Sequence, residues 1–134
     1  MTPMKEDYLK IIFELGGGYK KVSNKEISLG LGIAAGSVTE MITKLTEEGL
    51  VSHEPYDGIA LTPEGIKHAA ELVRKHRLWE TFLVDDLHYS MTDVHPEAEI
   101  LEHNTSDRLA TALDAFLNHP KYCPHGGVIP AANG

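Results

Sequence analysis

Two adjoining stretches, SNKEISLGLG at residues 23–32 and AAGSVTEMITKLTEEG at residues 34–49, decide the fold of this chain. Ser23 and Glu26 have the spacing of a capping box, in which each side chain accepts a hydrogen bond from the backbone of the other residue. A short helix is therefore expected to begin at Ser23 and to end near Leu31. Gly32 follows as a turn residue, because glycine readily adopts the left-handed backbone found after helices.

A second helix is expected from about Ala35 to Glu48, with Gly49 as its C-cap. Two short β-prone runs follow, Leu50–His53 and Ile59–Leu61. The residues between them, Pro55-Tyr56-Asp57-Gly58, contain the Asp-Gly pair that is typical of hairpins. A helix, a glycine turn, a second helix and a hairpin, in this order, predict a winged helix-turn-helix.

The rest of the chain is predicted to be mostly helical. Apolar periodicity and capping residues indicate four further helices, at about Lys5–Leu15, Pro63–Asp85, Asp93–His103 and Asp107–Leu117. The last of these is expected to place Leu109, Leu113 and Phe116 on one apolar face, whereas the tail from His119 to Gly134 shows no periodicity. We expect a DNA-binding domain at residues 1–62 and a helical domain with a C-terminal tail at residues 63–134.

Composition limits the possible functions of the 134-residue chain. Its 42% hydrophobic and 24% charged residues are ordinary for a globular protein, and no apolar run approaches the roughly 20 residues of a membrane span. A single cysteine excludes an intramolecular disulfide and favours a cytoplasmic location. The net charge of −8 is unfavourable for DNA binding, but two bound divalent ions would reduce it to −4 (−8 + 2 × 2).

The second helix of the helix-turn-helix pair is the predicted DNA-reading element. Its hydroxyl side chains suit contacts with phosphates and thymine methyl groups, and its glutamate can accept a hydrogen bond from cytosine. The small residues at its start allow a close approach to the bases. The predicted DNA-contacting residues are Ala34, Gly36, Ser37, Thr39, Glu40, Thr43 and Lys44. A winged helix used for protein contacts is the alternative.

Glu99, Glu102 and His103 have the i, i+3, i+4 spacing that places three side chains on one helix face. Two carboxylates so close repel each other unless a cation lies between them. This pattern predicts half of a metal site, with oxygen and nitrogen ligands that suit Mn(II), Fe(II) or Zn(II) better than Cu(I). A solvated charged face is the simpler alternative.

A second group of candidate ligands lies elsewhere in the sequence. His76 and Glu80 continue the inner apolar stripe of the long helix, where polar groups need a partner. Cys123 and His125 add a thiol and an imidazole in the tail, and His95 is a further possible ligand. A buried hydrogen bond between His76 and Glu80 remains the structural alternative to a metal site.

Five segments together resemble the metal-dependent repressors related to the diphtheria toxin repressor, especially their manganese-responsive streptococcal-type members. The segments are Met1–Lys10, Ser37–Met41, Arg74–Leu78, Glu97–His103 and Cys123–Gly127. The resemblance covers nearly the whole chain. It implies a dimeric repressor of metal-uptake genes that binds double-stranded operator DNA when Mn(II) or Fe(II) is plentiful.

The resemblance also implies two metal sites in each protomer. The primary site would take Asp7, Glu99, Glu102 and His103. The second would take His76, Glu80, Cys123 and His125, with His95 possible. Mn(II) is the expected ion, with Fe(II) or Zn(II) as alternatives, and no catalytic residue, organic cofactor or membrane partner is expected.

The chain departs from the pattern of the family it resembles at three places. Lys10 replaces a glutamate of the compact manganese regulators, which favours two separate sites over a closely spaced pair of ions. Glu99 replaces the cysteine of iron-responsive relatives, which favours manganese. Larger members of the family continue past the position of Gly134 into an SH3-like third domain, so the chain is expected to be either a natural two-domain form or a truncated one. Any ligand of the second site that this domain normally supplies is then missing.

Two other functions are compatible with parts of the sequence. A carboxylate-bridged metalloenzyme would use Glu-x-x-His pairs, but it leaves the helix-turn-helix unexplained. A metal-independent winged-helix regulator that senses a small ligand leaves the acidic and histidine residues unexplained.

Overall fold

The computed structural model describes residues 1–54 and 57–132 of the chain. It forms two compact units, Met1–Ala70 and Glu71–Gly134, and the boundary between them falls inside the longest helix, α4 (Pro63–Asp85). The described residues contain six helices and one two-stranded sheet, so the predicted mostly α fold is confirmed.

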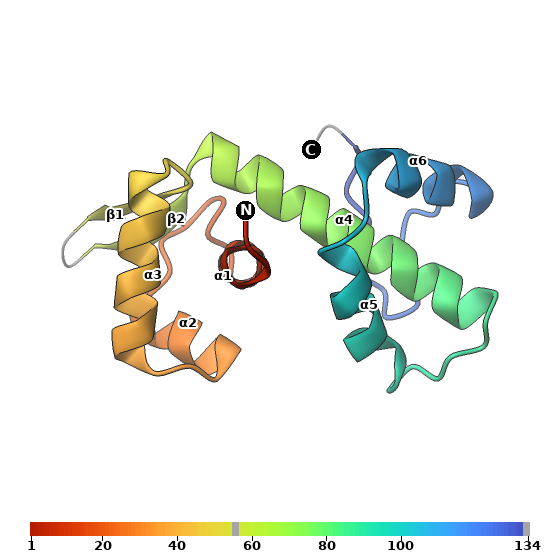
Figure 1. Ribbon diagram of the computed structural model, residues 1–134, viewed down its shortest axis with the longest axis horizontal. Coiled ribbons are helices and arrows are strands. Elements are labelled where there is room, and N and C mark those ends of the chain that lie inside the picture. The colour runs from red at the N-terminus through yellow and green to blue at the C-terminus, as the bar shows by residue number, and fades with distance from the viewer. Residues whose placement is uncertain (55–56, 133–134) are drawn as a thin grey trace. The chain divides into compact units, whose positions relative to one another are not determined.

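The first unit is a winged helix-turn-helix, as the sequence predicts. Its elements are α1 (Pro3–Glu14), α2 (Asn24–Leu31), α3 (Ala35–Glu47), β1 (Val51–Glu54) and β2 (Gly58–Leu61). Helix α3 packs against α2 on one side and β1 on the other, and Figure 1 shows it beside the hairpin. This arrangement leaves the outer face of α3 in solvent.

The helix ends follow the sequence closely. Ser23 and Glu26 form the predicted capping box, and Gly32 ends α2 with a left-handed φ of 66°. At the end of α3 the C-cap is Glu48, one residue earlier than predicted, and Gly49 adopts the left-handed conformation just after it, with φ of 76°. Helix α1 begins two residues earlier than predicted.

The early start of α1 has a local cause. Thr2 caps the helix by accepting a hydrogen bond from the backbone of Lys5, and Pro3 occupies the first turn, where a missing N–H costs nothing. The same Thr-Pro pair, Thr62-Pro63, opens α4, where the Thr62 hydroxyl accepts from the backbone of Gly65 as expected.

The wing is an antiparallel hairpin in which Val51 pairs with Leu61 and Glu54 with Gly58. Val22 adds a third, isolated bridge, because its backbone exchanges two hydrogen bonds with Ile59, at 2.7 and 2.8 Å. Pro55 and Tyr56 of the predicted turn lie outside the described residues. The bridge at Val22 ties the start of α2 to the wing.

A continuous apolar core holds the first unit together. Every element contributes to it, with the buried side chains of Tyr8, Leu9, Ile12, Val22, Ile27, Val38, Ile42, Leu45, Leu50, Val51, Ile59, Leu61 and Ala69. Burying one such aliphatic or aromatic side chain contributes about 1.5–3 kcal/mol, which explains why the unit is stable around a short hairpin.

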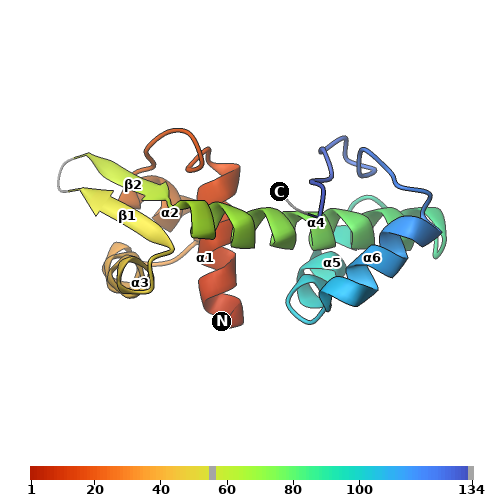
Figure 2. The same cartoon turned by 90° about the horizontal axis from the view of Figure 1, so that it is seen from above.

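The second unit consists of the later turns of α4, helices α5 (Val94–Glu102) and α6 (Asp107–Phe116), and the tail. Figure 2 shows α6 alongside the later turns of α4, where Leu78 packs with Ala110 and Leu113. Leu113 of the predicted apolar face is buried, whereas Leu109 and Phe116 are 45% and 67% exposed. The small Ala110 is fully buried and packs with Leu78 of α4.

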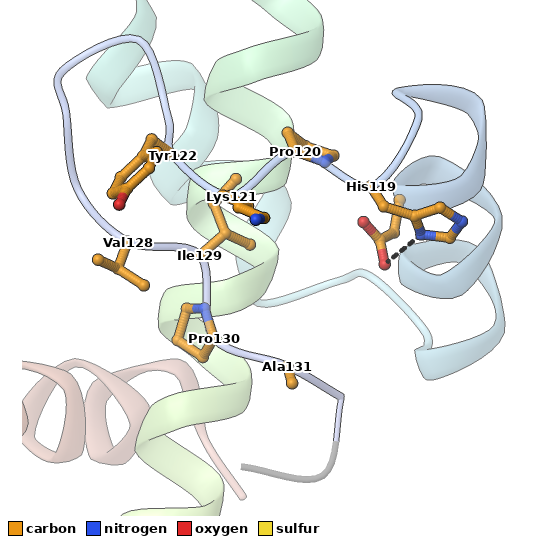
Figure 3. Close-up of a pocket in the computed structure, with 9 residues that line it drawn as sticks. His119, Pro120, Lys121, Tyr122, Val128, Ile129, Pro130 and Ala131 are labelled. Atoms are coloured by element: carbon orange, nitrogen blue, oxygen red, sulfur yellow. Dashed lines mark hydrogen bonds and ion pairs between the residues drawn. The ribbon is translucent and has the colours of Figure 1, made fainter.

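The tail is more ordered than its sequence predicts. The backbone of Cys123 exchanges hydrogen bonds with Gly126 and Gly127, and Tyr122 forms a bridge with Val128. Arg77 on α4 donates a hydrogen bond to the carbonyl oxygen of Val128 and anchors this turn. A pocket of about 340 Å³ lies nearby, and Nδ1 of its lining residue His119 is 3.3 Å from Oδ2 of Asp114. Figure 3 shows side chains that line this pocket.

Candidate metal centre

His76 and Glu80 lie one turn apart on α4, and both are buried, as the apolar stripe predicts. Their nearest side-chain atoms, Nε2 of His76 and Oε2 of Glu80, are 3.3 Å apart. The structural alternative considered above, a buried His–Glu contact, is therefore present. Other imidazoles also lie close to the same carboxylate oxygen, so a simple pair does not describe the site.

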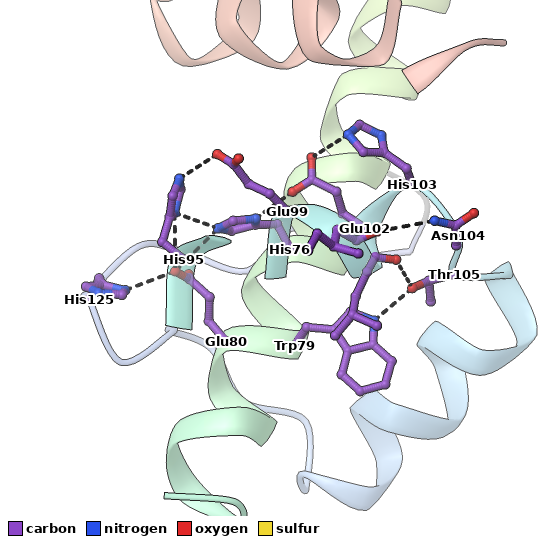
Figure 4. Close-up of polar contacts among 12 residues, drawn as sticks. His76, Trp79, Glu80, His95, Glu99, Glu102, His103, Asn104, Thr105 and His125 are labelled. Atoms are coloured by element: carbon purple, nitrogen blue, oxygen red, sulfur yellow. Dashed lines mark hydrogen bonds and ion pairs between the residues drawn. The ribbon is translucent and has the colours of Figure 1, made fainter. Parts of the chain in front are cut away.

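Three imidazole rings converge on Oε2 of Glu80 (Figure 4). Besides His76, Nδ1 of His125 lies 3.1 Å away and Nδ1 of His95 lies 3.8 Å away. The ring nitrogens of His76 and His95 that face this centre are themselves 3.1 Å apart. The structure thus brings together residues from α4, from the start of α5 and from the tail.

The opposite nitrogen of each ring faces a hydrogen-bond acceptor outside the centre. Nδ1 of His76 lies 2.6 Å from Oε1 of Glu102, Nε2 of His95 lies 2.7 Å from Oε1 of Glu99, and Nε2 of His125 lies 2.9 Å from the carbonyl oxygen of Met91. Carboxylates and carbonyls only accept hydrogen bonds, so these outer nitrogens carry the hydrogens.

The inner nitrogens of neutral rings then point lone pairs at one another and at Glu80. Such a cluster repels itself unless a proton or a metal ion lies between the groups. Three imidazoles and a carboxylate are ligands that Zn(II), Fe(II) and Mn(II) accept, and hydrogen-bonded outer nitrogens are usual for metal-binding histidines. The residues therefore fit a divalent transition-metal ion.

The electrostatics of Glu80 agree with this arrangement. Burial alone raises the pKa of its carboxyl group, but hydrogen bonds and charge from His76, charge from His125 and a hydrogen bond from Cys123 together bring the pKa below its usual value. Glu80 is consequently an anion at the centre of the cluster, which is the state that binds a cation.

Cys123 reaches the same centre from the tail turn. Its thiol is buried, and its sulfur and a nitrogen of His125 can approach one ion together with Glu80. The backbone N–H of Gly127 donates to the sulfur at 3.3 Å. Gly126 has a left-handed φ of 89°, which lets the turn fold back so that Gly127 meets the backbone of Cys123.

Two residues of the predicted primary site, Glu102 and His103, lie together, whereas the side chain of Glu99 does not join them. The carboxylate of Glu102 is buried, and its Oε2 lies 3.8 Å from Nε2 of His103. Glu99 instead turns toward His95, one turn earlier on the same helix, and both side chains are more than half exposed. Asp7 lies on α1 in the first unit.

The predicted DNA-reading surface is exposed on α3 and its N-cap. This holds for all seven residues, Ala34, Gly36, Ser37, Thr39, Glu40, Thr43 and Lys44. The hydroxyls of Thr39 and Thr43 donate to the carbonyl oxygens one turn earlier, so each side chain is held in one rotamer. Asn24 on α2 donates a hydrogen bond to the carbonyl oxygen of Ala35. The sequence does not predict this contact, because the two residues are eleven positions apart and share no helix.

No helix among the described residues has the length and hydropathy that a membrane span requires.

Comparison with protein families gives two matches that together cover most of the chain. Residues 1–59 match the N-terminal DNA-binding domain of the iron-dependent repressors. Residues 62–131 match the metal-binding and dimerisation domain of the same family. The second match includes His76, Glu80, His95, Cys123 and His125, which together are called the histidine cluster below.

Individual relatives agree with the family match. The HTH-type transcriptional regulator MntR of Listeria welshimeri is 35% identical over 129 residues, covering 89% of this chain and 86% of the relative. The structure of the manganese regulator SloR is 49% identical with a TM-score of 0.87, and a manganese-dependent transcriptional repressor in complex with manganese is 45% identical with a TM-score of 0.88.

These structures cover 100% and 97% of this chain, whereas the chain spans only 62% and 60% of their lengths. The two matched domains belong to one family, and the fold contains a winged helix-turn-helix and a helical second unit in the same order. The chain therefore belongs to the iron-dependent repressor family.

Proposed function

We propose that this chain is a metal-dependent transcriptional repressor that binds operator DNA as a homodimer and controls metal-uptake genes. The observation that carries the proposal is the convergence of three imidazole nitrogens on the buried Glu80, within a region that matches a metal-binding and dimerisation domain. A repressor acts on the chromosome, so we infer a cytoplasmic location.

The proposed ligands of the histidine cluster are His76, Glu80, Cys123 and His125, with His95 as a further ligand. Mn(II) is the proposed activating ion, since the similar repressors named above are manganese regulators. Fe(II) and Zn(II) are alternatives because most sites of this kind bind later transition metals more tightly, and selection depends on geometry and availability. When bound, the ion supplies positive charge and fixed coordination.

A second ion is proposed for Glu99, Glu102 and His103, with Asp7 as the fourth ligand. This assignment rests on the helical spacing of the three α5 residues and on the family resemblance. Two ions would lower the net charge of each protomer from −8 to −4 (−8 + 2 × 2) and so reduce repulsion from DNA.

The DNA contacts are assigned to the exposed face of α3. A helix of this kind enters the major groove, and a dimer places two such helices about 34 Å apart, one turn of DNA. The dimer surface is assigned to α5 and α6. These helices expose the large apolar side chains of Ile100, Leu109 and Phe116, which a second copy of the chain would cover.

Metal-dependent binding to a palindromic promoter fragment from a metal-uptake operon tests the proposal. Fluorescence anisotropy at fixed salt would be followed while Mn(II), Fe(II) or Zn(II) is titrated, with a chelator control. We expect binding that appears with the metal and disappears with the chelator. Binding that ignores the chelator would indicate a metal-independent regulator, and absence of binding with every ion would refute the proposal for this chain.

Variants connect the result with the proposed sites. Glu80→Gln removes the central charge with little change in volume and should weaken activation by metal, whereas the exposed Glu97→Gln on α5 is the matched control. Asp7→Ala should leave the dimer intact and lose metal-activated DNA binding. Retention of Mn(II)-dependent binding in Asp7→Ala would remove this residue from the proposed primary site.

A further inference from the structure

Glu102 lies between the two proposed groups of metal ligands. Its side chain is fully buried, with Oε1 2.6 Å from Nδ1 of His76 and Oε2 3.8 Å from Nε2 of His103. Figure 4 shows the carboxylate between these two rings. His76 turns its other nitrogen, Nε2, toward Glu80 and the histidine cluster. One carboxylate therefore contacts a residue of each group.

We propose that Glu102 is a positioning residue of the histidine cluster, which it holds ready for metal through His76, and that this contact couples the two ions. The inference rests on the metal centre proposed above. It assigns Glu102 a role beyond that of a primary-site ligand.

The contact with Glu102 orients the ring of His76. Carboxylates only accept hydrogen bonds, and each ring nitrogen of His76 faces one, with Nδ1 2.6 Å from Glu102 and Nε2 3.3 Å from Glu80. Nδ1 therefore donates to Glu102, and an ion bound at the cluster would take the place of any hydrogen on Nε2, which would then offer its lone pair. Both side chains are buried, so a competing hydrogen bond from water is excluded and the ring orientation is fixed. Such an outer carboxylate also raises the basicity of the ligating imidazole.

The same contact links the histidine cluster to the other proposed ion. A metal bound at Nε2 of His76 makes its Nδ1–H a stronger donor, which holds Oε1 of Glu102 more firmly. Oε2 is then left in a fixed position on the His103 side. Because coupling between two binding events is reciprocal, an ion held by Glu102 and His103 should also favour binding at the histidine cluster.

The contact between Glu99 and His95 does not support an equal role for Glu99. Both of those side chains are more than half exposed, and solvent screens their interaction. The buried contact between Glu102 and His76 is shorter and has no competing water, so it carries the inference.

Cobalt titration of the whole chain tests the role of Glu102. Coordination of Co(II) by the Cys123 thiolate gives a sulfur-to-cobalt charge-transfer absorption, which reports on the histidine cluster alone, and Cys123→Ser provides the blank. Glu102→Ala removes the acceptor, whereas Glu102→Gln keeps an oxygen that can accept from Nδ1 of His76. Glu97→Gln, an exposed change on α5, leaves both groups of ligands and the contact between Glu102 and His76 in place and is the matched control.

We expect Glu102→Ala to weaken cobalt binding at the cluster by about tenfold or more, as loss of an outer partner usually does. Glu102→Gln should stay within about threefold of the unmodified chain, because the accepting oxygen is retained. Glu97→Gln should match the unmodified chain. Unchanged binding in Glu102→Ala, or equal loss in Glu102→Gln and Glu102→Ala, would overturn the inference.

A measurement on the unmodified chain keeps the test decisive if Glu102→Ala does not fold. Nitrogen-15 NMR of the metal-free chain distinguishes the two tautomers of His76. We expect hydrogen on Nδ1, and hydrogen on Nε2 alone would overturn the inference. Absence of the Cys123 absorption in the unmodified chain would instead refute the metal centre itself, so the two failures are distinguishable.

Discussion

The Nε2 atom of His125 lies 2.9 Å from the carbonyl oxygen of Met91, so the imidazole of the tail is held by the segment that joins α4 to α5. The hydrogen on Nε2 leaves Nδ1 to face Glu80 at 3.1 Å. A backbone acceptor of this kind cannot be recognised in the sequence. Every residue has a backbone carbonyl oxygen, and only the fold decides which one lies next to His125. The tail turn is thus held by the segment between α4 and α5, and it directs a nitrogen of His125 at the proposed metal centre.

Metal binding should therefore protect the tail turn from hydrogen exchange. With metal 100-fold above its Kd, binding stabilises the bound form by about 2.7 kcal/mol, which is about 100-fold slower exchange at Cys123–Gly127 if opening releases the ion. Hydrogen–deuterium exchange with and without Zn(II) or Mn(II) measures this effect. In His125→Ala the protection should be largely lost, and equal protection in the two chains would contradict the assignment of His125.

Cys123→Ser should change which metal binds best. A thiolate is a soft ligand that favours Zn(II) over Mn(II), and a serine hydroxyl is a much poorer ligand for either. We expect Zn(II) affinity to fall at least about tenfold, with a smaller loss for Mn(II). Competition titrations against a chromophoric chelator give both constants. An equal loss for the two ions would show that the sulfur does not discriminate between them.

Lys44→Ala should weaken DNA binding in a way that salt reveals. Lys44 is exposed on α3, and a lysine that contacts phosphate releases a counterion when DNA binds. Its removal should lower the slope of log affinity against log salt by about one for each protomer and weaken all sequences alike. Lys121→Ala, an exposed change in the tail, is the matched control. An unchanged salt slope in Lys44→Ala would place this residue outside the DNA contact.

Local signals in the sequence predicted the elements of the first unit well. The capping box at Ser23 and Glu26, the Thr62-Pro63 start of α4 and the Asp57-Gly58 pair act over a few residues, so their effects can be recognised without the fold. The bridge between Val22 and Ile59 could not be predicted, because it joins residues that are distant in the sequence and not in one hairpin.

The candidate metal residues show the same limit. Helical spacing correctly indicated that His76 and Glu80 lie together, since that contact depends on one helix. The same reasoning placed Glu99 beside Glu102 and His103, whereas its side chain pairs with His95, which is equally close along α5. Spacing identifies which residues share a face, but the choice of partner depends on neighbouring helices.

Glu71→Gln should stabilise the metal-free chain at neutral pH. Burial raises the pKa of the Glu71 carboxyl, although Arg74 and Lys75 lower it in part. The folded state therefore binds this proton more tightly than the unfolded state. The resulting stability is present below the ordinary carboxyl pKa and is lost as the pH rises through the raised value.

The expected gain in Tm for Glu71→Gln at pH 7 is about 2 °C, and it should shrink as the pH falls toward 4. Thermal unfolding of the metal-free chain between pH 4 and pH 7 measures the effect. Glu64→Gln, an exposed change in the first turn of α4, should show no such pH-dependent gain. A gain in Glu71→Gln that is constant across this pH range would indicate a cause other than ionisation.

Ile100→Glu should dissociate the proposed dimer without unfolding the chain. Ile100 is 63% exposed on α5, so a charge there meets water in the monomer and is buried without a partner in a dimer. Leu29→Glu on α2 is the matched control, because Leu29 is 73% exposed in the DNA-binding unit and outside the proposed dimer surface. Sedimentation equilibrium should show at least about tenfold weaker association for Ile100→Glu alone, the equivalent of about 1.4 kcal/mol.

Since operator binding requires two correctly spaced reading helices, Ile100→Glu should lose affinity for a palindromic site more than for a half-site. Equal association of the two variants would move the dimer surface away from α5.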